Sequence, residues 1–197
     1  MCGIVGYIGN KQALPILVQG LRRLEYRGYD SAGVAILDEG KINRSRAVGK
    51  TDELAEKVKD KKLEGTIGIA HTRWATHGGV TEENAHPHFG CDGKLVIVHN
   101  GIIENYRELR EKLSDKHEFK SETDTEVLAH LIESHYKGDL RLAIESALKH
   151  VRGTYGLVAM HEDHPDKLVA ARLGSPLVIG VDDGEYYIAS DATPMLV

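Results

Sequence analysis

The sequence predicts an α+β fold with antiparallel sheets rather than a doubly wound parallel sheet. Short apolar segments typical of strands occur in runs, and the helical patterns are grouped between them instead of alternating one by one with strands. The chain has 21 glycines in 197 residues, scattered between apolar runs, which indicates many tight turns. This length fits one domain.

The first third of the chain predicts a strand, a helix, a hairpin and a second helix. β-Branched apolar runs indicate the strands, and apolar residues at helical spacing indicate the first helix. Asp38-Glu39-Gly40 is the expected hairpin turn, and Thr51 is the expected N-cap of the second helix. The strands are expected over residues 2–8, 31–37 and 41–48, and the helices over 13–24 and 53–60.

The middle of the chain predicts a long functional loop followed by grouped helices. Residues 71–92 are polar and rich in histidine, and a loop of this length in a compact domain is usually functional or disordered. Thr123 and Glu126 fit a capping box at the start of a helix. The expected strands are residues 65–70 and 94–99, and the expected helices are 104–113, 124–136 and 140–150.

The last part of the chain predicts a meander of strands. Gly174-Ser175-Pro176 and Asp182-Asp183-Gly184 are the turn signals. The chain stops on the apolar residues 194–197, so we expect it to be truncated at this end. The strands are expected over residues 153–160, 167–173, 177–181 and 185–189.

Composition argues against several classes of partner. The chain has 30 Asp and Glu against 25 Lys and Arg, with no long basic run, so nucleic acid and anionic membranes are not expected partners. No apolar run is long enough to span a membrane, and the N-terminus lacks the basic region of a signal peptide. Two cysteines cannot build a disulfide scaffold, which favours a reducing, cytoplasmic location.

Cys2 is a candidate nucleophile because removal of the initiator methionine would make it the N-terminal residue. It would then carry a thiol with a reference pKa of about 8.5 and an α-amine with one of about 7.7 to 8.0. An N-terminal amine that activates its own side chain is an established design. The alternative is a small buried residue in the first strand, and Cys2 alone favours that alternative.

Two further motifs suggest a bound substrate and a stabilised oxyanion. In HTRWATHGG, Arg73 could hold a carboxylate by paired charged hydrogen bonds, and Gly78 and Gly79 could hinge a closing loop. The alternative is an exposed arginine beside a core tryptophan. Asn100-Gly101 predicts either a type I′ turn or an oxyanion hole made by the Asn amide and the Gly N–H. Spacing alone decides neither case.

Asp124 and a group of histidines leave two more alternatives open. Asp124 in SETDTE suits the dipole at a helix start, or it could accept the ammonium of an amino-acid substrate. A metal site is a weaker hypothesis than nucleophilic catalysis, because neither HExxH nor C-x-x-C is present. The residues that suggest a metal are His71, His77, His86, His88, Cys91 and His99.

Together these motifs resemble the glutaminase domain of class II glutamine amidotransferases, which are N-terminal-nucleophile hydrolases. MCGI alone is shared with the purine-pathway and asparagine synthetase members, whereas RWATHG and HNGIIENY are more specific to members that carry a sugar isomerase half. The segments that follow the family's order are MCGIVGYIG, EYRGYDSAG, HTRWATHG, NAHPH, HNGIIENY, SETDTE and LGSPLVIG.

The resemblance implies a four-layer αββα sandwich with two antiparallel sheets between helices. Residues 1–197 would be one glutaminase domain, truncated at its C-terminal end and without the sugar isomerase domains. The implied reaction converts L-glutamine to L-glutamate and ammonia with no cofactor or metal. The ammonia would convert fructose 6-phosphate to glucosamine 6-phosphate in a full-length homodimer. A different class II amidotransferase, or a metal-dependent hydrolase built on residues 71–99, remains the alternative.

The resemblance also implies a role for each site residue. Cys2 would be the nucleophile and its freed α-amine the base, while Asn100 and Gly101 would form the oxyanion hole. Arg73 would hold the substrate α-carboxylate and Asp124 its α-ammonium. The remaining implied positions are Thr76 and His77 for substrate contacts, Trp74 as a gate toward an ammonia channel, and Arg27 and His86 as residues that line or support the site.

Overall fold

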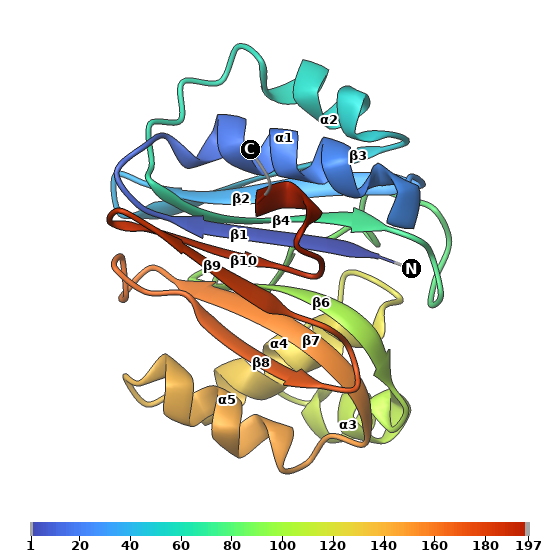
Figure 1. The fold of residues 1–197 in the computed structure, drawn as a ribbon. Coiled ribbons are helices and arrows are strands. Elements are labelled where there is room, and N and C mark those ends of the chain that lie inside the picture. Colours follow the sequence, from blue (N-terminus) through green and yellow to red (C-terminus); the bar gives the residue numbers. More distant parts are fainter. Residues whose placement is uncertain (1, 196–197) are drawn as a thin grey trace.

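The computed structural model describes residues 2–195, which form four layers. Two antiparallel sheets face each other, and helices cover the outer face of each sheet (Figure 1). The helices on one side are α1 (Ala13–Leu24) and α2 (Thr51–Val58), and those on the other are α3 (Tyr106–Leu113), α4 (Asp124–His135) and α5 (Leu140–Leu148). The predicted αββα sandwich is confirmed.

The first sheet holds the N-terminal strand in its interior. Its six strands run in the order β3-β2-β4-β1-β10-β9. Strand β1 pairs with β4 on one side and β10 on the other, so Cys2, just before it, is held at the end of a paired strand. The strands of this sheet are β1 (Gly3–Ile8), β2 (Ser31–Asp38), β3 (Lys41–Val48), β4 (Ile67–Arg73), β9 (Val178–Asp182) and β10 (Glu185–Ala189).

The second sheet settles the conformation of the Asn-Gly pair. Asn100 and Gly101 lie inside β6, opposite Gly156 and Tyr155 of β7, so the type I′ turn that one interpretation of the sequence favoured is wrong. The four strands run in the order β5-β6-β7-β8. They are β5 (His88–Phe89), β6 (Leu95–Ile103), β7 (Gly153–His161) and β8 (Val169–Leu173).

Three apolar layers hold the sandwich together, and burial of apolar surface is the main favourable term in such packing. One lies between α1, α2 and the first sheet, and a second between α3 to α5 and the second sheet. The third fills the space between the sheets, where Ile4, Ile69 and Val98 are fully buried. Among residues 2–195, no helix is both long enough and apolar enough to cross a membrane.

Several predicted boundaries differ from the structure. Thr51 begins α2 rather than capping it; Lys50 precedes the helix, and no side-chain cap is made there. Thr123 does cap α4, since its hydroxyl accepts from the Glu126 N–H at 3.2 Å. The Glu126 carboxylate accepts from Ser121 instead of returning to Thr123, so only half of the capping box forms.

The predicted loop over residues 71–92 is shorter in the structure. Its first three residues extend β4, and β5 lies within it. Short 3₁₀ turns also occur at Glu25–Arg27 and Thr193–Met195. The apolar chain end that predicted truncation includes residues 196–197, which lie outside the described residues.

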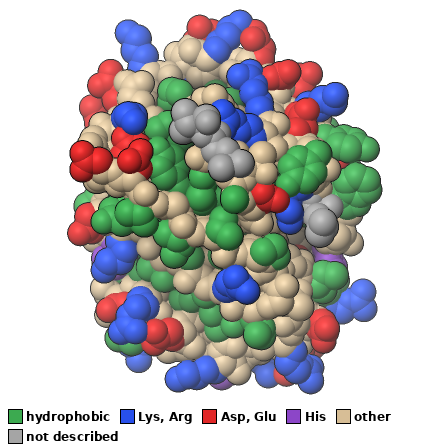
Figure 2. Space-filling view, in the orientation of Figure 1, with side chains coloured by type: hydrophobic (Ala, Val, Ile, Leu, Met, Phe, Trp, Pro, Cys, Tyr) green, Lys and Arg blue, Asp and Glu red, His purple; other side chains and the backbone are tan. Residues whose placement is uncertain are grey.

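Strand β9 forms one edge of the first sheet and presents apolar side chains to solvent. Ile179 and Val181 are 69% and 70% exposed. Figure 2 shows the face that Figure 1 views, where hydrophobic side chains gather across the middle between charged groups. The opposite edge of this sheet, β3, exposes the polar residues Lys41 and Asn43 as well as Val48 at its end.

Candidate active site

A cavity of about 330 Å³ opens where β1 begins, β4 ends and α4 begins. These elements are far apart in the sequence, and the sandwich brings their ends together. Every residue to which the family resemblance assigned a role lines this cavity: Cys2, Arg27, Arg73, Trp74, Thr76, His77, His86, Asn100, Gly101 and Asp124.

The Cys2 side chain and main chain are both held by hydrogen bonds. The N–H of Trp74 donates to the Cys2 Sγ at 3.2 Å. The Cys2 carbonyl oxygen accepts from Arg27 Nε at 3.0 Å and from Asn100 Nδ2 at 3.1 Å. Burial raises the pKa of the Cys2 thiol, and the Trp74 N–H only partly opposes this effect. A thiol in this setting needs a nearby base to react at neutral pH.

The orientation of the Asn100 amide is fixed by a buried histidine. Its Oδ1 lies 3.0 Å from His71 Nε2. Burial lowers the pKa of His71 to about 3, so the ring is neutral at physiological pH. Because Asn100 uses its nitrogen to donate to Cys2, its oxygen accepts from the His71 Nε2–H. His71 therefore keeps the amide nitrogen of Asn100 directed toward Cys2.

Gly101 occupies a position that only glycine fits. Its φ is +131°, a value that L side chains rarely adopt. A Cβ atom there would lie 2.1 Å from the carbonyl oxygen of Thr154 on the neighbouring strand. The backbone of Gly101 lines the cavity directly after Asn100. The pair therefore offers a side-chain amide and a main-chain N–H at adjacent positions of one strand.

Arg73 is buried and organises the loop that follows β4. It is 3% exposed, so the alternative of an exposed arginine is wrong. Its guanidinium donates to the carbonyls of His77 and Gly78, and to that of Gly79 at 3.0 Å. Burial lowers the pKa of Arg73, while nearby acidic groups oppose that effect. Arg73 therefore brings a positive charge to the cavity, and its hydrogen bonds hold the loop at the rim of the cavity.

Trp74 lies at the surface of the pocket rather than in the core. It is 49% exposed, which overturns the alternative of a core tryptophan. The rings of Trp74 and Tyr29 are nearly perpendicular, with their centroids 5.6 Å apart. The side chain thus stands at the rim of the cavity, directly after the Arg73 that anchors the loop.

Asp124 supplies a negative charge on the other side of the cavity. It is the first residue of α4, and its Oδ2 accepts from the Ile103 N–H at 2.8 Å. Its Oδ1 lies 4.0 Å from His77 Nδ1. Arg73 and Asp124 thus bring opposite charges to one cavity. This pairing suits a zwitterionic amino acid.

Sequence reasoning missed a buried network behind these residues. Thr125 Oγ1 lies 2.9 Å from both His86 Nε2 and His99 Nδ1. The His86 ring also stacks on His71 at a centroid distance of 4.0 Å. Burial lowers the pKa values of His86 and His99, so both are neutral. Thr125 carries no catalytic signature of its own, and the only sequence signal was its place in SETDTE.

The histidine-based metal hypothesis does not match the geometry. His77, His86 and His99 line the active cavity, whereas His88 and Cys91 line a neighbouring one. Among the residues that the structure describes, one group of His, Cys, Asp and Glu side chains converges closely enough for a metal. It shares only Cys91 with the predicted set and consists of Cys91, His117, His130 and Glu133.

The αββα sandwich, with a cysteine before its internal first strand and opposite charges in its pocket, defines an amidotransferase of the N-terminal-nucleophile class. A family model described as a glutamine amidotransferase domain matches residues 71–197. The chain belongs to this glutamine amidotransferase family.

The relatives and solved structures agree with this assignment. The glutamine–fructose-6-phosphate aminotransferase [isomerizing] of Thermus thermophilus is 55% identical over 197 residues, which are 100% of this chain and 32% of that protein. The protein of the same name from Pyrococcus horikoshii is 53% identical, over 100% of this chain and 33% of its own length. The chain therefore spans about a third of these relatives.

Solved structures of amidotransferases resemble nearly the whole chain. Glutamine phosphoribosylpyrophosphate amidotransferase from B. subtilis, complexed with ADP and GMP, superimposes with a TM-score of 0.86 at 29% identity. The match covers 98% of this chain and 43% of that one. The two-sheet arrangement is thus shared with an amidotransferase whose full chain is more than twice as long.

Proposed function

We propose that residues 1–197 form one glutaminase domain, which hydrolyses L-glutamine to L-glutamate and ammonia through a thioester on Cys2. The observation that carries this proposal is the convergence of a cysteine, an arginine, a carboxylate and an Asn-Gly pair on one cavity of about 330 Å³. Arg73 binds the α-carboxylate and Asp124 the α-ammonium, which places the side-chain amide of glutamine toward Cys2.

The first step is attack of the Cys2 sulfur on the carboxamide carbon. The freed α-amine of Cys2 accepts the thiol proton, and the Asn100 Nδ2–H and the Gly101 N–H stabilise the oxyanion. The amine then gives its proton to the leaving nitrogen, which departs as ammonia. Water attacks the thioester, releases glutamate and restores the thiol.

The α-amine is a better base than the neighbouring histidines. Burial lowers the pKa of His71 to about 3 and also lowers those of His86 and His99. An N-terminal amine has a reference pKa of about 7.7 to 8.0, near the pH at which a general base works best. These histidines therefore position Asn100 and Thr125 rather than move protons.

The remaining pocket residues support binding and release. Thr76 and His77 contact the substrate from the loop that Arg73 holds, and Trp74 at the rim gates the path by which ammonia leaves. Arg27 holds the Cys2 carbonyl at 3.0 Å, which fixes the nucleophile. His86 supports the site through Thr125.

The relatives' names suggest where the ammonia goes. In a longer protein, we expect this domain to supply ammonia to a sugar isomerase half that converts fructose 6-phosphate to glucosamine 6-phosphate, in a homodimer. The thiols of Cys2 and Cys91 are both free, which is consistent with a reducing cytoplasm.

A glutaminase assay with intact-mass analysis tests the proposal. The chain that lacks Met1 should release glutamate from glutamine, and a glutamine-like alkylating agent should modify residue 2. Cys2→Ala should keep the fold and glutamine binding but lose hydrolysis. As a matched control, a form with an uncleaved residue before Cys2 keeps the thiol but lacks its free amine, and it should be inactive. Full activity in either altered form would refute the mechanism.

A further inference from the structure

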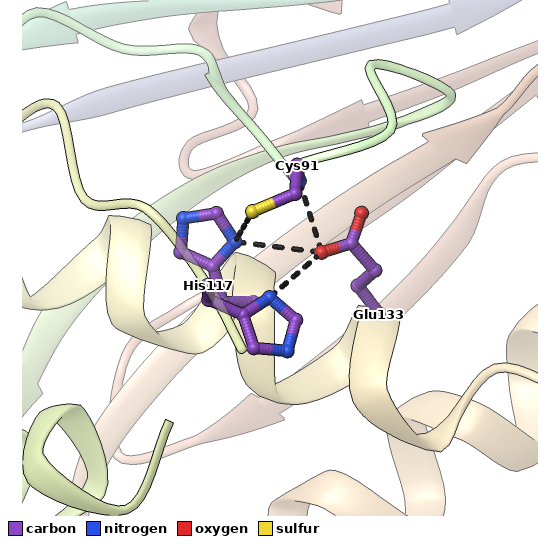
Figure 3. A group of neighbouring side chains, drawn as sticks. Cys91, His117 and Glu133 are labelled. Carbon is purple, nitrogen blue, oxygen red and sulfur yellow. Dashed lines mark hydrogen bonds and ion pairs between the residues drawn. The ribbon is translucent and has the colours of Figure 1, made fainter. Parts of the chain in front are cut away.

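A second cluster of reactive side chains lies outside the glutamine pocket. Cys91 comes from the turn between β5 and β6, His117 from the segment between α3 and α4, and His130 and Glu133 from successive positions on one side of α4. One potential ligand atom from each of the four lies within 4.8 Å of all the others. Figure 3 shows Cys91, His117 and Glu133 directed toward one another.

Three of the six separations between these atoms approach the edges of a tetrahedral coordination shell, and all six are within 4.8 Å. Cys91 Sγ lies 3.6 Å from His130 Nδ1, and that nitrogen lies 3.5 Å from Glu133 Oε2. His117 Nδ1 lies 3.0 Å from the same oxygen. With zinc–sulfur bonds of about 2.3 Å and zinc–nitrogen or zinc–oxygen bonds of about 2.0 to 2.2 Å, the edges of a tetrahedron are about 3.3 to 3.6 Å.

One ligand atom lacks the hydrogen bond that burial demands. His117 Nδ1 is buried and makes no hydrogen bond of acceptable geometry, although Glu133 Oε2 is close. A buried polar atom without a hydrogen bond destabilises the fold, because it has lost its contact with water and gained no partner. A cation at the centre of the cluster would bind this nitrogen. It would also bind the nearby carboxylate oxygen, so that both atoms coordinate the same ion.

The surroundings of the cluster already resemble an outer coordination shell. His130 Nε2, on the far side of its ring, faces Glu126 Oε1 at 3.8 Å, close enough for the two charges to interact but too far for a hydrogen bond. Glu133 is oriented by two main-chain donors, the N–H of Cys91 to Oε2 and the N–H of Asp92 to Oε1, each at 2.9 Å. Carboxylates behind ligating histidines, and hydrogen bonds to ligating carboxylates, are the usual outer contacts of metal sites.

The cluster also has a route for a metal ion. Cys91 is exposed, whereas the His130 side chain is 2% exposed, so the ligands extend from the surface inward. Cys91 and His130 both line a cavity of about 310 Å³ that neighbours the active pocket. An ion can therefore reach the buried histidine past the cysteine without opening the fold.

We propose that Cys91, His117, His130 and Glu133 bind one Zn²⁺ in a closed tetrahedral site. On binding, the Cys91 thiol and any protonated histidine release their protons to solvent, and both histidines coordinate as neutral rings through Nδ1. Four protein ligands leave no open position for a substrate, which is typical of a structural rather than a catalytic zinc.

The bound zinc would stabilise one wall of the glutamine pocket without touching it. It connects the β5–β6 turn and the segment before α4 to the body of α4, and the same helix begins with Asp124 in the cavity. This proposal does not rest on the glutaminase proposal, because its test measures metal binding and spectra.

Metal titration of the chelator-treated chain tests the site. Zn²⁺ should bind with one ion per chain in a competition assay with a chromogenic chelator, and saturating Zn²⁺ should raise the melting temperature, because a ligand that binds only the folded state stabilises it. Co²⁺, used as a spectroscopic probe, should give a thiolate charge-transfer band and the intense visible bands of four-coordinate cobalt.

Single substitutions locate the ion. Cys91→Ser should abolish the charge-transfer band, and His117→Ala should weaken Zn²⁺ binding by at least about tenfold, since even outer-shell changes cost about 10- to 100-fold. Cys2→Ser and the surface variant His150→Asn are matched thiol and imidazole controls, and both should bind Zn²⁺ as the unaltered chain does. Absence of stoichiometric binding, or a cobalt spectrum that Cys91→Ser leaves unchanged, would overturn the proposal.

Discussion

The side-chain amide of Asn100 donates to the main-chain carbonyl of Cys2 at 3.1 Å, so the proposed oxyanion donor is bonded to the residue that carries the nucleophile. His71 fixes the direction of this amide from behind. Two sheets meet at this contact, because Cys2 precedes β1 of the first and Asn100 lies in β6 of the second. The packing of the sandwich therefore sets the geometry of the proposed catalytic pair.

Replacing Asn100 should slow catalysis far more than it weakens binding. Asn100→Ala removes a donor aimed at charge that develops in the transition state, and loss of one such donor typically costs about 100- to 1000-fold in kcat. Steady-state kinetics of glutamate release measure the effect. The exposed Asn43→Ala, on β3, is the matched control and should keep the unaltered kcat. A kcat within threefold of normal in Asn100→Ala would contradict the oxyanion role.

Replacing Arg73 should raise the KM for glutamine. Arg73→Ala removes both the proposed carboxylate contact and the bonds to the loop carbonyls, and hydrogen bonds to charged groups contribute about 1.5 to 3 kcal/mol, or about 10- to 150-fold. Arg73→Lys keeps the charge but loses the planar fork, so it should recover only part of the affinity. Arg141→Ala removes an arginine that pairs with Glu145 on the surface, and it should leave KM unchanged. An unchanged KM in Arg73→Ala would exclude the clamp.

Replacing Gly101 should damage the fold itself. The φ of Gly101 is +131°, which strains an alanine, and the added Cβ of Gly101→Ala would lie 2.1 Å from the Thr154 carbonyl oxygen. Strands β6 and β7 must therefore separate locally to accept it. We expect a loss of several kcal/mol in the free energy of unfolding. Gly93→Ala is the matched control, because the φ of Gly93 is +73° but no atom lies within 4 Å of the added Cβ. It should lower the free energy of unfolding by only about 1 to 2 kcal/mol. Urea denaturation compares the two, and equal losses would show that the steric contact is unimportant.

Sequence patterns predicted the strands and helices well because most of them bury one regular face. The helix at residues 13–24 matches α1, and the hairpin around residues 38–40 matches β2 and β3. The Asn100-Gly101 turn failed because a local turn signal was overridden by pairing with β7, where a glycine at positive φ fits inside the ladder. Thr51 was also predicted wrongly as a cap. It is the first residue of α2, and its hydroxyl is buried without a hydrogen bond instead of accepting from the helix.

The residues that line the cavity were easier to predict from the sequence than the residues that support them. A thiol, a guanidinium and a carboxylate each supply a chemistry that few other side chains can supply. Cys2, Arg73 and Asp124 also lie in motifs of the family, which mark their positions. The supporting contacts of Thr125 and the convergence of Cys91 with His117 depend on how distant segments pack. No spacing rule in the sequence relates a turn at residue 91 to a segment at residue 117, so only the three-dimensional structure brings them together.

Buried histidines make the fold sensitive to mild acid. Burial lowers the pKa of His71 to about 3, while an unfolded histidine titrates at about 6.5. Below about pH 6.5 the unfolded state therefore binds more protons than the folded state, and the free energy of unfolding falls as pH falls. Burial shifts the pKa values of His86, His88 and His99 in the same direction. Each such histidine contributes up to about 1.4 kcal/mol per pH unit.

Urea denaturation between pH 6.5 and 5.0 measures this loss above the range in which unfolded carboxylates titrate, near pH 4. We expect the free energy of unfolding to fall by several kcal/mol over this interval.

His130 should not add to this loss. Burial lowers its pKa, but the carboxylates of Glu126 and Glu133 raise it by more, so the pKa is raised overall. A histidine with a raised pKa stabilises the fold at low pH. His88→Gln keeps a polar group near Thr123 but removes one titrating ring, so its pH slope should be shallower by about one proton. A free energy of unfolding that stays constant from pH 6.5 to 5.0 would show that these histidines are protonated in the folded state.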